Sequence, residues 1–218
     1  MTKEESQMST EAQEALKSAE LGGLKKKLNA ASWSDHMEDL MKSWGEKAAG
    51  LRWMHNQSAG SWKGFSDKLT ISSIVLTTVG GAAAFGGSNS SSPELMYALG
   101  GVGIVSSLVQ SIKKFYQAEE KQADHAAIAK QFGSFYRAMT LELGMGREDR
   151  RPADEIAAWA SKEYDRMQQD APNISGPVIS RFRKTFSDAS SIPDVAESHF
   201  VIKVQGRVGA IDVDDIDV

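Results

Sequence analysis

Histidine is the residue type in this chain that most readily binds a metal or transfers a proton near neutral pH. Its four copies, His36, His55, His125 and His199, are spread over separate segments of the 218 residues. No two of them have the i, i+4 spacing with a carboxylate that helical zinc sites use. His55 and His125 can meet across two helices, where we expect a neutral imidazole bonded to a polar neighbour. A pH-sensitive gate is the alternative use of this pair.

Other catalytic chemistry is not indicated. The chain has no cysteine, which excludes disulfides, thiolate nucleophiles and cysteine-bound metals. The glycines that begin at Gly80 and at Gly100 lie in apolar runs without the Lys and Ser or Thr of a phosphate-binding loop. We therefore predict a protein that is not an enzyme and has neither a cofactor nor a bound metal. A net charge of -4 and a pI near 5.6 argue against a nucleic-acid partner.

Two apolar segments, Leu69–Gly87 and Leu95–Ile112, dominate the sequence that would position these histidines, and a polar stretch lies between them. Neither segment contains Asp, Glu, Lys, Arg or His. Each has about the 18–20 residues that a helix needs to cross a hydrocarbon core. The sequence therefore predicts a two-helix transmembrane hairpin over residues 69–112.

Lysines on both sides of this hairpin predict its orientation. Lys63 and Lys68 precede the first apolar segment, Lys113 and Lys114 follow the second, and the connecting loop has no Lys or Arg. By the positive-inside rule, both termini are expected on the cytoplasmic side of a membrane. No signal peptide opens the chain, so the first span is expected to act as its own insertion signal.

Small residues recur at four-residue spacing in both apolar segments, which lets helix backbones approach closely. The residues that we assign to this contact are Gly80, Ala84, Gly87, Gly103 and Ser107. Packing within one hairpin is the expected use. An oligomeric pore lined by hydroxyl groups and glycines, and buried helices of a soluble bundle, are the alternatives.

The sequence before the hairpin divides into two parts. Residues 1–31 are polar, with few large apolar side chains, and are expected to be flexible. Residues 32–62 carry apolar side chains at steps of three and four, which predicts an amphipathic helix with Ser32 or Ser34 as its N-cap. The charged residues around His36, including Glu38, are expected to form a solvated face of this helix.

A second amphipathic helix is predicted after the hairpin, over residues 113–144. It has the length and period to pack antiparallel on the first helix and so to extend the hairpin as a stalk on the cytoplasmic side. The residues that we assign to this packing are Trp44, Leu51, His55, His125 and Phe132.

The remaining sequence is predicted to form a small irregular region. Residues 150–186 indicate helices that end in a basic segment, in which Arg181, Arg183 and Lys184 are candidates for docking a partner. Within residues 187–218, the stretch 199–208 alternates enough to form a β-strand, and 211–218 is an acidic tail. The expected fold class is thus mainly α, with a transmembrane hairpin, a helical stalk and a short strand near the C-terminus.

Two runs of residues carry a family resemblance. The first is Trp33-x2-His36-Met37-Glu38-x-Leu40-x3-Trp44-x-Glu46-Lys47-Ala48, followed by Leu51-Arg52-Trp53-Met54-His55, and the second is Glu119-Glu120-x4-His125-x6-Phe132. Together they resemble the SLATT-type two-transmembrane proteins over about half of the chain. That family includes membrane-perturbing effectors of bacterial nucleotide-sensing conflict systems. The Trp-rich version is closer to similar two-span proteins in large DNA viruses of eukaryotes.

From the hairpin and the resemblance, we expect an integral membrane structural protein that anchors a larger assembly. The resemblance implies a minor capsid or inner-membrane protein of a large DNA virus particle. The expected partners are the lipid bilayer, other structural proteins of the assembly and further copies of the chain. An oligomeric pore-forming or membrane-disrupting effector is the alternative function.

Overall fold

A computed structural model describes residues 3–87 and 93–197 of the chain. Within these ranges, side chains are described except at residues 3–12, 15, 84–87 and 95. The elements, in chain order, are α1 (Lys3–Ser32), α2 (Asp35–Gly87), α3 (Pro93–Tyr116), α4 (Ala118–Gly144), α5 (Ala153–Asp170), α6 (Gly176–Thr185) and the short 3-10 helix η1 (Asp194–Ala196). Helices are therefore the only regular secondary structure in the described part of the chain, which has no strand.

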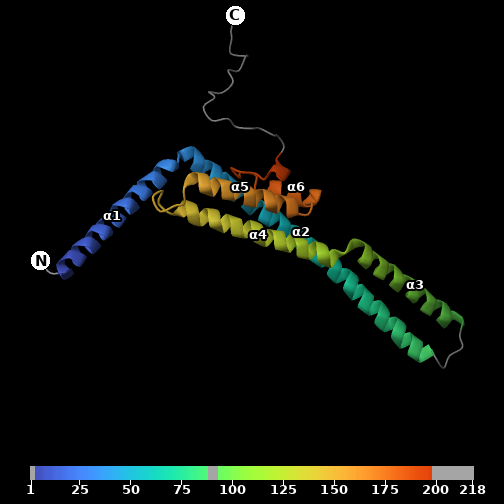
Figure 1. Cartoon of the computed structure of the whole chain (residues 1–218). Coiled ribbons are helices and arrows are strands. Elements are labelled where there is room, and N and C mark those ends of the chain that lie inside the picture. Colours follow the sequence, from blue (N-terminus) through green and yellow to red (C-terminus); the bar gives the residue numbers. More distant parts are fainter. Residues whose placement is uncertain (1–2, 88–92, 198–218) are drawn as a thin grey trace, which may run out of the picture.

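Helix α2 is the axis of the molecule. Its 53 residues correspond to a rod about 80 Å long at 1.5 Å per residue. The helix begins at the predicted N-cap, where the Oγ of Ser34 accepts a hydrogen bond from the backbone N–H of Met37 at 3.2 Å. Figure 1 shows α4 lying along the first half of α2 and α3 lying along its second half.

The join between α3 and α4 is a single residue. Gln117 has a φ of 45°, in the left-handed region that non-glycine residues seldom adopt. Its backbone N–H still bonds to the carbonyl of Lys113, and its own carbonyl accepts the N–H of Lys121. The chain therefore changes direction here without losing its hydrogen bonds, and α3 and α4 together follow nearly the whole length of α2 (Figure 1).

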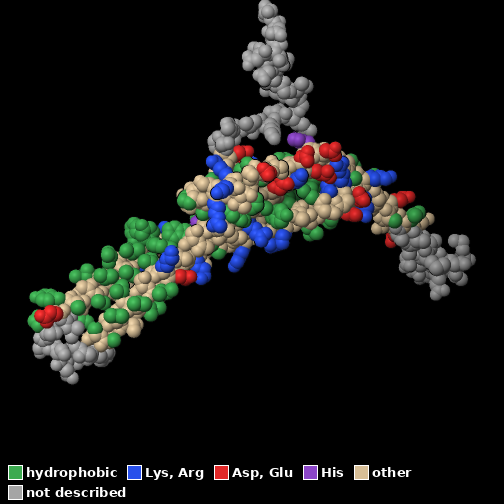
Figure 2. Space-filling model, turned by 180° about the vertical axis from the view of Figure 1, so that it is seen from behind, with side chains coloured by type: hydrophobic (Ala, Val, Ile, Leu, Met, Phe, Trp, Pro, Cys, Tyr) green, Lys and Arg blue, Asp and Glu red, His purple; other side chains and the backbone are tan. Residues whose placement is uncertain are grey.

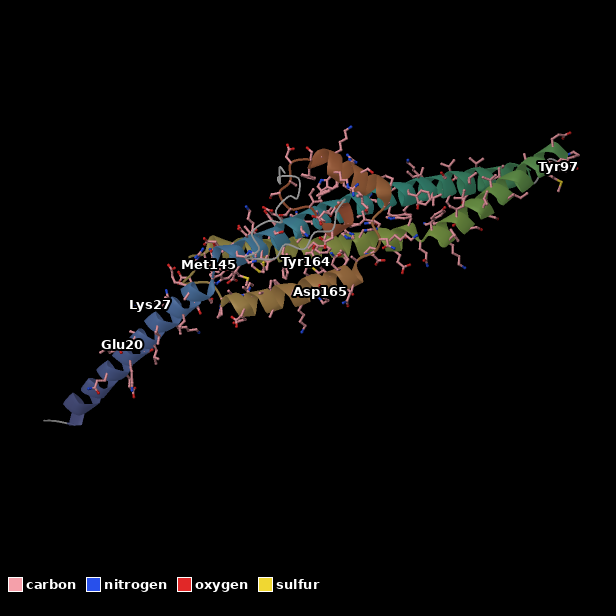
Figure 3. All side chains as sticks on the ribbon, turned by 90° about the horizontal axis from the view of Figure 1, so that it is seen from above. Glu20, Lys27, Tyr97, Met145, Tyr164 and Asp165 are labelled. Atoms are coloured by element: carbon pink, nitrogen blue, oxygen red, sulfur yellow. The ribbon has the colours of Figure 1, made fainter. Side chains whose placement is uncertain are left out.

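The hydrophobic core lies between the first half of α2 and α4, with α5 and α6 covering it. Figure 3 shows α5 beside α4 and α6 beside α2, on two sides of this pair. The fully buried large side chains in this core are Met41, Met54, His55, Phe132, Met139, Ile156, Met167 and Pro193. We call this part, residues 33–66 and 118–197, the body.

Helix α1 extends away from the body (Figure 1). Its described side chains are mostly exposed. The sequence predicted a flexible segment over 1–31, whereas the structure shows a helix from Lys3. Many of its residues are Ala, Glu, Lys, Gln and Leu, which are good helix formers. Contacts with the body occur at its C-terminal end, where Lys26 pairs with Asp149 at 2.7 Å and Asn29 bonds to the carbonyl of Arg150 at 3.2 Å.

The transmembrane hairpin and the membrane localisation predicted from the sequence are wrong. Among the described residues, no helix is long and apolar enough to cross a membrane. The apolar run of α2 follows Asp67 and Lys68 directly and is diluted by Thr and Ser side chains. That of α3 contains Gln110 and several glycines, and it ends at Lys113. Two helices do lie side by side here, but their hydropathy does not support a transmembrane hairpin with a stalk on its cytoplasmic side.

The C-terminal predictions are covered only in part. The helical region predicted over 150–186 contains α5 and α6. The strand predicted over 199–208 and the acidic tail over 211–218 lie outside the described residues.

Replacing Phe132 by Ala should lower the free energy of unfolding by about 3–5 kcal/mol. Its ring is 0% exposed, between α2 and α4, so truncation leaves a cavity. The matched control is Phe115→Ala, whose ring is 79% exposed and whose loss should cost less than about 0.5 kcal/mol. Urea unfolding followed by circular dichroism measures both changes. Equal tolerance of the two substitutions would contradict the proposed core.

Candidate functional site

His55 of α2 and His125 of α4 meet inside the body. Their Nδ1 atoms are 2.9 Å apart, so one ring donates its N–H and the other accepts it. Both side chains are buried, and the ring of His55 stacks on Phe132 with centroids 5.8 Å apart. The helical periods of α2 and α4 bring the pair together at the centre of the interface predicted from the sequence.

The protein environment favours the neutral form of both rings. Burial lowers the pKa of His55 to about 4, and His125 lowers it in the same direction. Burial also lowers the pKa of His125, although Asp124 opposes this shift. Within the described ranges, no group of three or more His, Cys, Asp or Glu side chains is placed to hold a metal ion. The arrangement therefore supports a structural hydrogen bond, which fixes how α2 and α4 are aligned.

The other predicted packing residues also lie in the body. Leu51 of α2 is buried in the core, and Trp44 of the same helix is half-buried. The indole of Trp44 stacks on Tyr164 of α5, with centroids 6.2 Å apart. From the sequence, Trp44 was assigned to the contact between two helices, and its contact with the helix predicted within 150–186 was not foreseen. The apolar stripe of α5, which includes Tyr164, was the available signal.

An ion-pair cluster at the end of the body was not predicted from the sequence. The guanidinium of Arg147 donates two hydrogen bonds to the carboxylate of Glu38, each 2.9 Å long, and Arg150 donates a third. Arg150 is 9% exposed, and it also donates to the carbonyls of Leu143 and Met145. Glu38 therefore joins α2 to the loop between α4 and α5, and the expectation of a solvated face is wrong at this residue. The three arginines within residues 147–151 were the available signal for such a partner.

The predicted docking residues do not form one surface. Arg181 donates to the side-chain carbonyl of Gln57 on α2 at 3.3 Å. Arg183 donates to the backbone carbonyls of Ala196 and Glu197, at 2.7 and 3.4 Å, and so holds η1 against α6. Lys184 is exposed in the last turn of α6. Two of the three side chains thus make contacts within the molecule.

An apolar surface covers the part of the molecule farthest from α1. Residues 69–83 of α2 and 96–112 of α3, which we call the hairpin arm, contain no charged residue. Figure 2 shows hydrophobic side chains along the arm and an acidic side chain at its tip, while most charged side chains lie on the body and on α1. The large apolar side chains that the arm exposes are Ile71, Ile74, Val75, Val79, Met96, Tyr97, Ile104, Val105 and Leu108. Tyr97 lies near the tip (Figure 3).

The two helices of the arm touch along a thin seam. Gln110 donates to the Oγ of Ser73 at 2.5 Å, and Lys113 donates to the hydroxyl of Thr70 at 3.2 Å. A Cβ at Gly80 would lie 3.2 Å from a methyl group of Val102, so this glycine does allow a close approach. None of the described side chains of the arm is buried.

The other small residues assigned to this contact are placed differently. A Cβ at Gly103 would meet no atom within 4 Å. The hydroxyl of Ser107 donates to the carbonyl of Gly103 in its own helix, at 2.9 Å. Ala84 and Gly87 belong to the end of α2, where side chains are not described. Of the described members of the set, only Gly80 lies at the contact between the two helices.

Comparison with known proteins gives no relative for this chain: no family model matches, and neither the curated proteins nor the solved structures contain a match. The resemblance to SLATT-type proteins and the implied place in a virus particle therefore gain no support from these comparisons. What the protein does must be argued from its surfaces and buried groups.

The free energy of unfolding should fall as the pH is lowered from about 6.5 toward 4. The histidine pKa is 6.5 in an unperturbed chain, but burial lowers it in the folded state. The unfolded state therefore binds more protons in this range, which favours unfolding. Urea midpoints measured across the range should show this slope. The double variant His55→Phe, His125→Phe should flatten it, and His36→Gln on the exposed surface should not. An unchanged slope in the double variant would contradict this role of the pair.

A second loss of stability should follow at lower pH. Hydrogen bonds from Arg147 and Arg150 lower the pKa of Glu38 to about 2, from 4.5 in an unperturbed chain. The stabilisation is therefore complete above about pH 4.5 and is lost as the pH falls toward 2. Glu38→Gln should lower the free energy of unfolding at pH 7 and reduce the loss in this acid range. The matched control, Glu120→Gln, lies on an exposed turn of α4; if it had the same effect, the cluster would not be the cause.

Proposed function

We propose that this protein is a non-enzymatic structural component of a larger assembly, in which copies of the chain are joined through their hairpin arms. The observation that carries this proposal is the row of exposed large apolar side chains on an arm without charges. Surfaces of this kind on proteins mark interaction sites.

The two helices of the arm bury too little apolar surface against each other to stabilise helices of this length. A pair of helices in water depends on burying an apolar stripe, because isolated helices are only marginally stable. In the body that stripe is buried by α4, α5 and α6, whereas in the arm the described side chains are intermediate or exposed. Contact with further apolar surface would supply the missing core.

A second copy of the arm is the partner that its chemistry favours. Two helical hairpins can pack side by side as a four-helix bundle, in which each buries the apolar stripe of the other. Such a contact is symmetric, so one patch serves both partners. Residues 69–93 and 95–112 carry no charged side chain, and only Glu94 at the tip is charged, so identical arms have little charge repulsion along their length. Thr77 and Ser107 already bond to carbonyls of their own helices, so their burial leaves no hydroxyl donor unpaired.

The rest of the molecule suits a structural role. The continuous helix α2 runs from the body into the arm, so a load on the arm is transmitted directly to the body (Figure 1). Helix α1 projects from the opposite end with exposed side chains and offers a surface for other structural proteins of the assembly. In this proposal the body acts as a spacer between two sites of association.

Introducing a charge on the arm should weaken self-association. Ile104→Asp replaces a side chain that is 73% exposed in the single chain and that would be buried in the paired arms. Loss of this burial should raise the dissociation constant about tenfold or more. Analytical ultracentrifugation of the full chain over a range of concentrations measures the effect. The matched control is Leu141→Asp on α4, where a side chain that is 69% exposed lies outside the arm.

Two results would overturn the proposal. One is that the chain stays monomeric at all accessible concentrations, or that Ile104→Asp and Leu141→Asp weaken its association equally. The other is a monomeric chain that floats with phosphatidylcholine and phosphatidylglycerol vesicles, because the arm would then be occupied by lipid. Release of a trapped dye from those vesicles would favour a membrane-disrupting effector instead.

A further inference from the structure

A cleft separates α2 from α6 on the body and encloses about 490 Å³. One wall is a face of α2 that includes Gly50, Trp53 and Asn56, and the other walls come from α6 and from residues 189–191. The cleft lies where the chain after α6 returns to α2, through the contact of Ser190 with Glu46 and that of the Pro193 ring with Gly50. It lies on the body, away from the hairpin arm.

The floor of the cleft is aromatic. Trp53 packs against Phe182 and Phe186, with centroids 5.8 and 5.4 Å away, and these two phenylalanines lie 5.0 Å from each other. The side chain of Phe186 is 37% exposed. Such a floor favours an apolar side chain from a ligand.

One arginine lines the cleft, and two others lie close to its lining residues. Arg52 lines the cleft, and its side chain runs over Gly133 of α4, where a Cβ would lie 3.1 Å from its Cδ. A guanidinium nitrogen of Arg137 approaches the same glycine, so two guanidinium groups converge there. Within residues 3–87 and 93–197, no carboxylate lies within 4.0 Å of either group. At the other end of the α2 face, Arg181 reaches Gln57, which follows the lining residue Asn56.

The one carboxylate that lines the cleft is already engaged. Glu46 accepts a hydrogen bond from the hydroxyl of Ser190 at 2.9 Å, and the ammonium of Lys42 lies 4.0 Å from it. The cleft therefore combines an apolar floor with guanidinium groups that can bind carboxylates, a combination that fits an acidic peptide with apolar side chains.

The chain itself carries such a peptide. Residues 211–218 read Ile-Asp-Val-Asp-Asp-Ile-Asp-Val, with four carboxylate side chains among four aliphatic ones. The last described residue, Glu197, is held near α6 by Arg183. The 14 residues from there to Ile211 can span up to about 46–50 Å when extended, which is ample to return to a cleft bordered by residues 189–191.

We propose that this cleft is the docking site for the acidic C-terminal segment 211–218, with its aliphatic side chains on the aromatic floor and its carboxylates on Arg52, Arg137 and Arg181. Docking within one chain would cover the cleft. Docking between chains would add a second link between copies, independent of the hairpin arm. The proposal does not rest on the proposed function, because the two surfaces share no residue.

The absence of cysteine allows a direct test by disulfide trapping in the full chain. Ala189→Cys in the cleft wall is paired with Val213→Cys in the acidic segment. The control pair combines Val213→Cys with Ser161→Cys, an exposed position on α5. Under mild oxidation, the cleft pair should form its disulfide at least about tenfold faster than the control pair. Non-reducing gels separate a bond within one chain from a bond between two chains, and either product supports docking.

Neutralising the arginines or the aspartates tests whether their attraction holds the segment in the cleft. Arg52→Gln and Arg137→Gln together, or replacement of the four aspartates of 211–218 by Asn, should slow trapping of the cleft pair by about tenfold, as expected for losing charge-assisted hydrogen bonds. Arg166→Gln on α5 is the matched control and should leave the rate unchanged. Equal rates for the two cysteine pairs, or a rate that does not respond to neutralisation, would overturn the proposal. Circular dichroism of each variant shows that it is folded.

Discussion

The packing of α4 on the first half of α2 is the interaction on which the rest of the structure depends. It buries Met41, Met54, Phe132 and Met139 in one continuous strip, and burial of apolar side chains is the dominant favourable term in folding. Every other element of the body is placed by it: α5 contacts α4, α6 contacts α2, and η1 is held by α6. The buried His55–His125 hydrogen bond sets the alignment of the two helices, since any sliding would leave two polar groups unpaired inside the core.

The contrast between the two halves of α2 explains the shape of the molecule. In the first half the helix is surrounded by three neighbours and has a core. Over residues 69–83 its contacts among the described residues are with α3, and the described side chains there are intermediate or exposed. One helix thus carries a folded body at one end and an apolar, uncharged surface at the other (Figure 2). In the proposed role, the body would supply the stability of the chain and the arm its contact with other copies.

Some charged groups form ion pairs that join elements of the body, and others lie at its surface. Glu38, Arg147 and Arg150 form a cluster that joins the start of α2 to the loop after α4, with Arg150 also over the ring of Trp33. Arg166 is similarly occupied by Glu163 and Asp170 along α5. Arg52 and Arg137, in contrast, converge on Gly133 beside the cleft without a carboxylate within 4.0 Å in the described part of the chain. Gly133 permits this convergence because any side chain there would meet Arg52.

The sequence alone determined that the helices on either side of residues 69–112 pack together and that His55, His125 and Phe132 lie in that contact. Their spacing at three and four residues assigns them to one face, and such spacing is a local property of a helix. Only the tertiary structure decided which residues contact each face of these helices. Trp44 contacts α5 and Glu38 pairs with Arg147 because residues more than a hundred positions apart meet there, and no local pattern encodes these contacts. The apolar runs were long enough to suggest membrane spans, but the described helices are too rich in Ser, Thr and Gly to bear this out. Composition revealed the apolar surface, while the arrangement of the helices decided that it stays uncovered within a single chain.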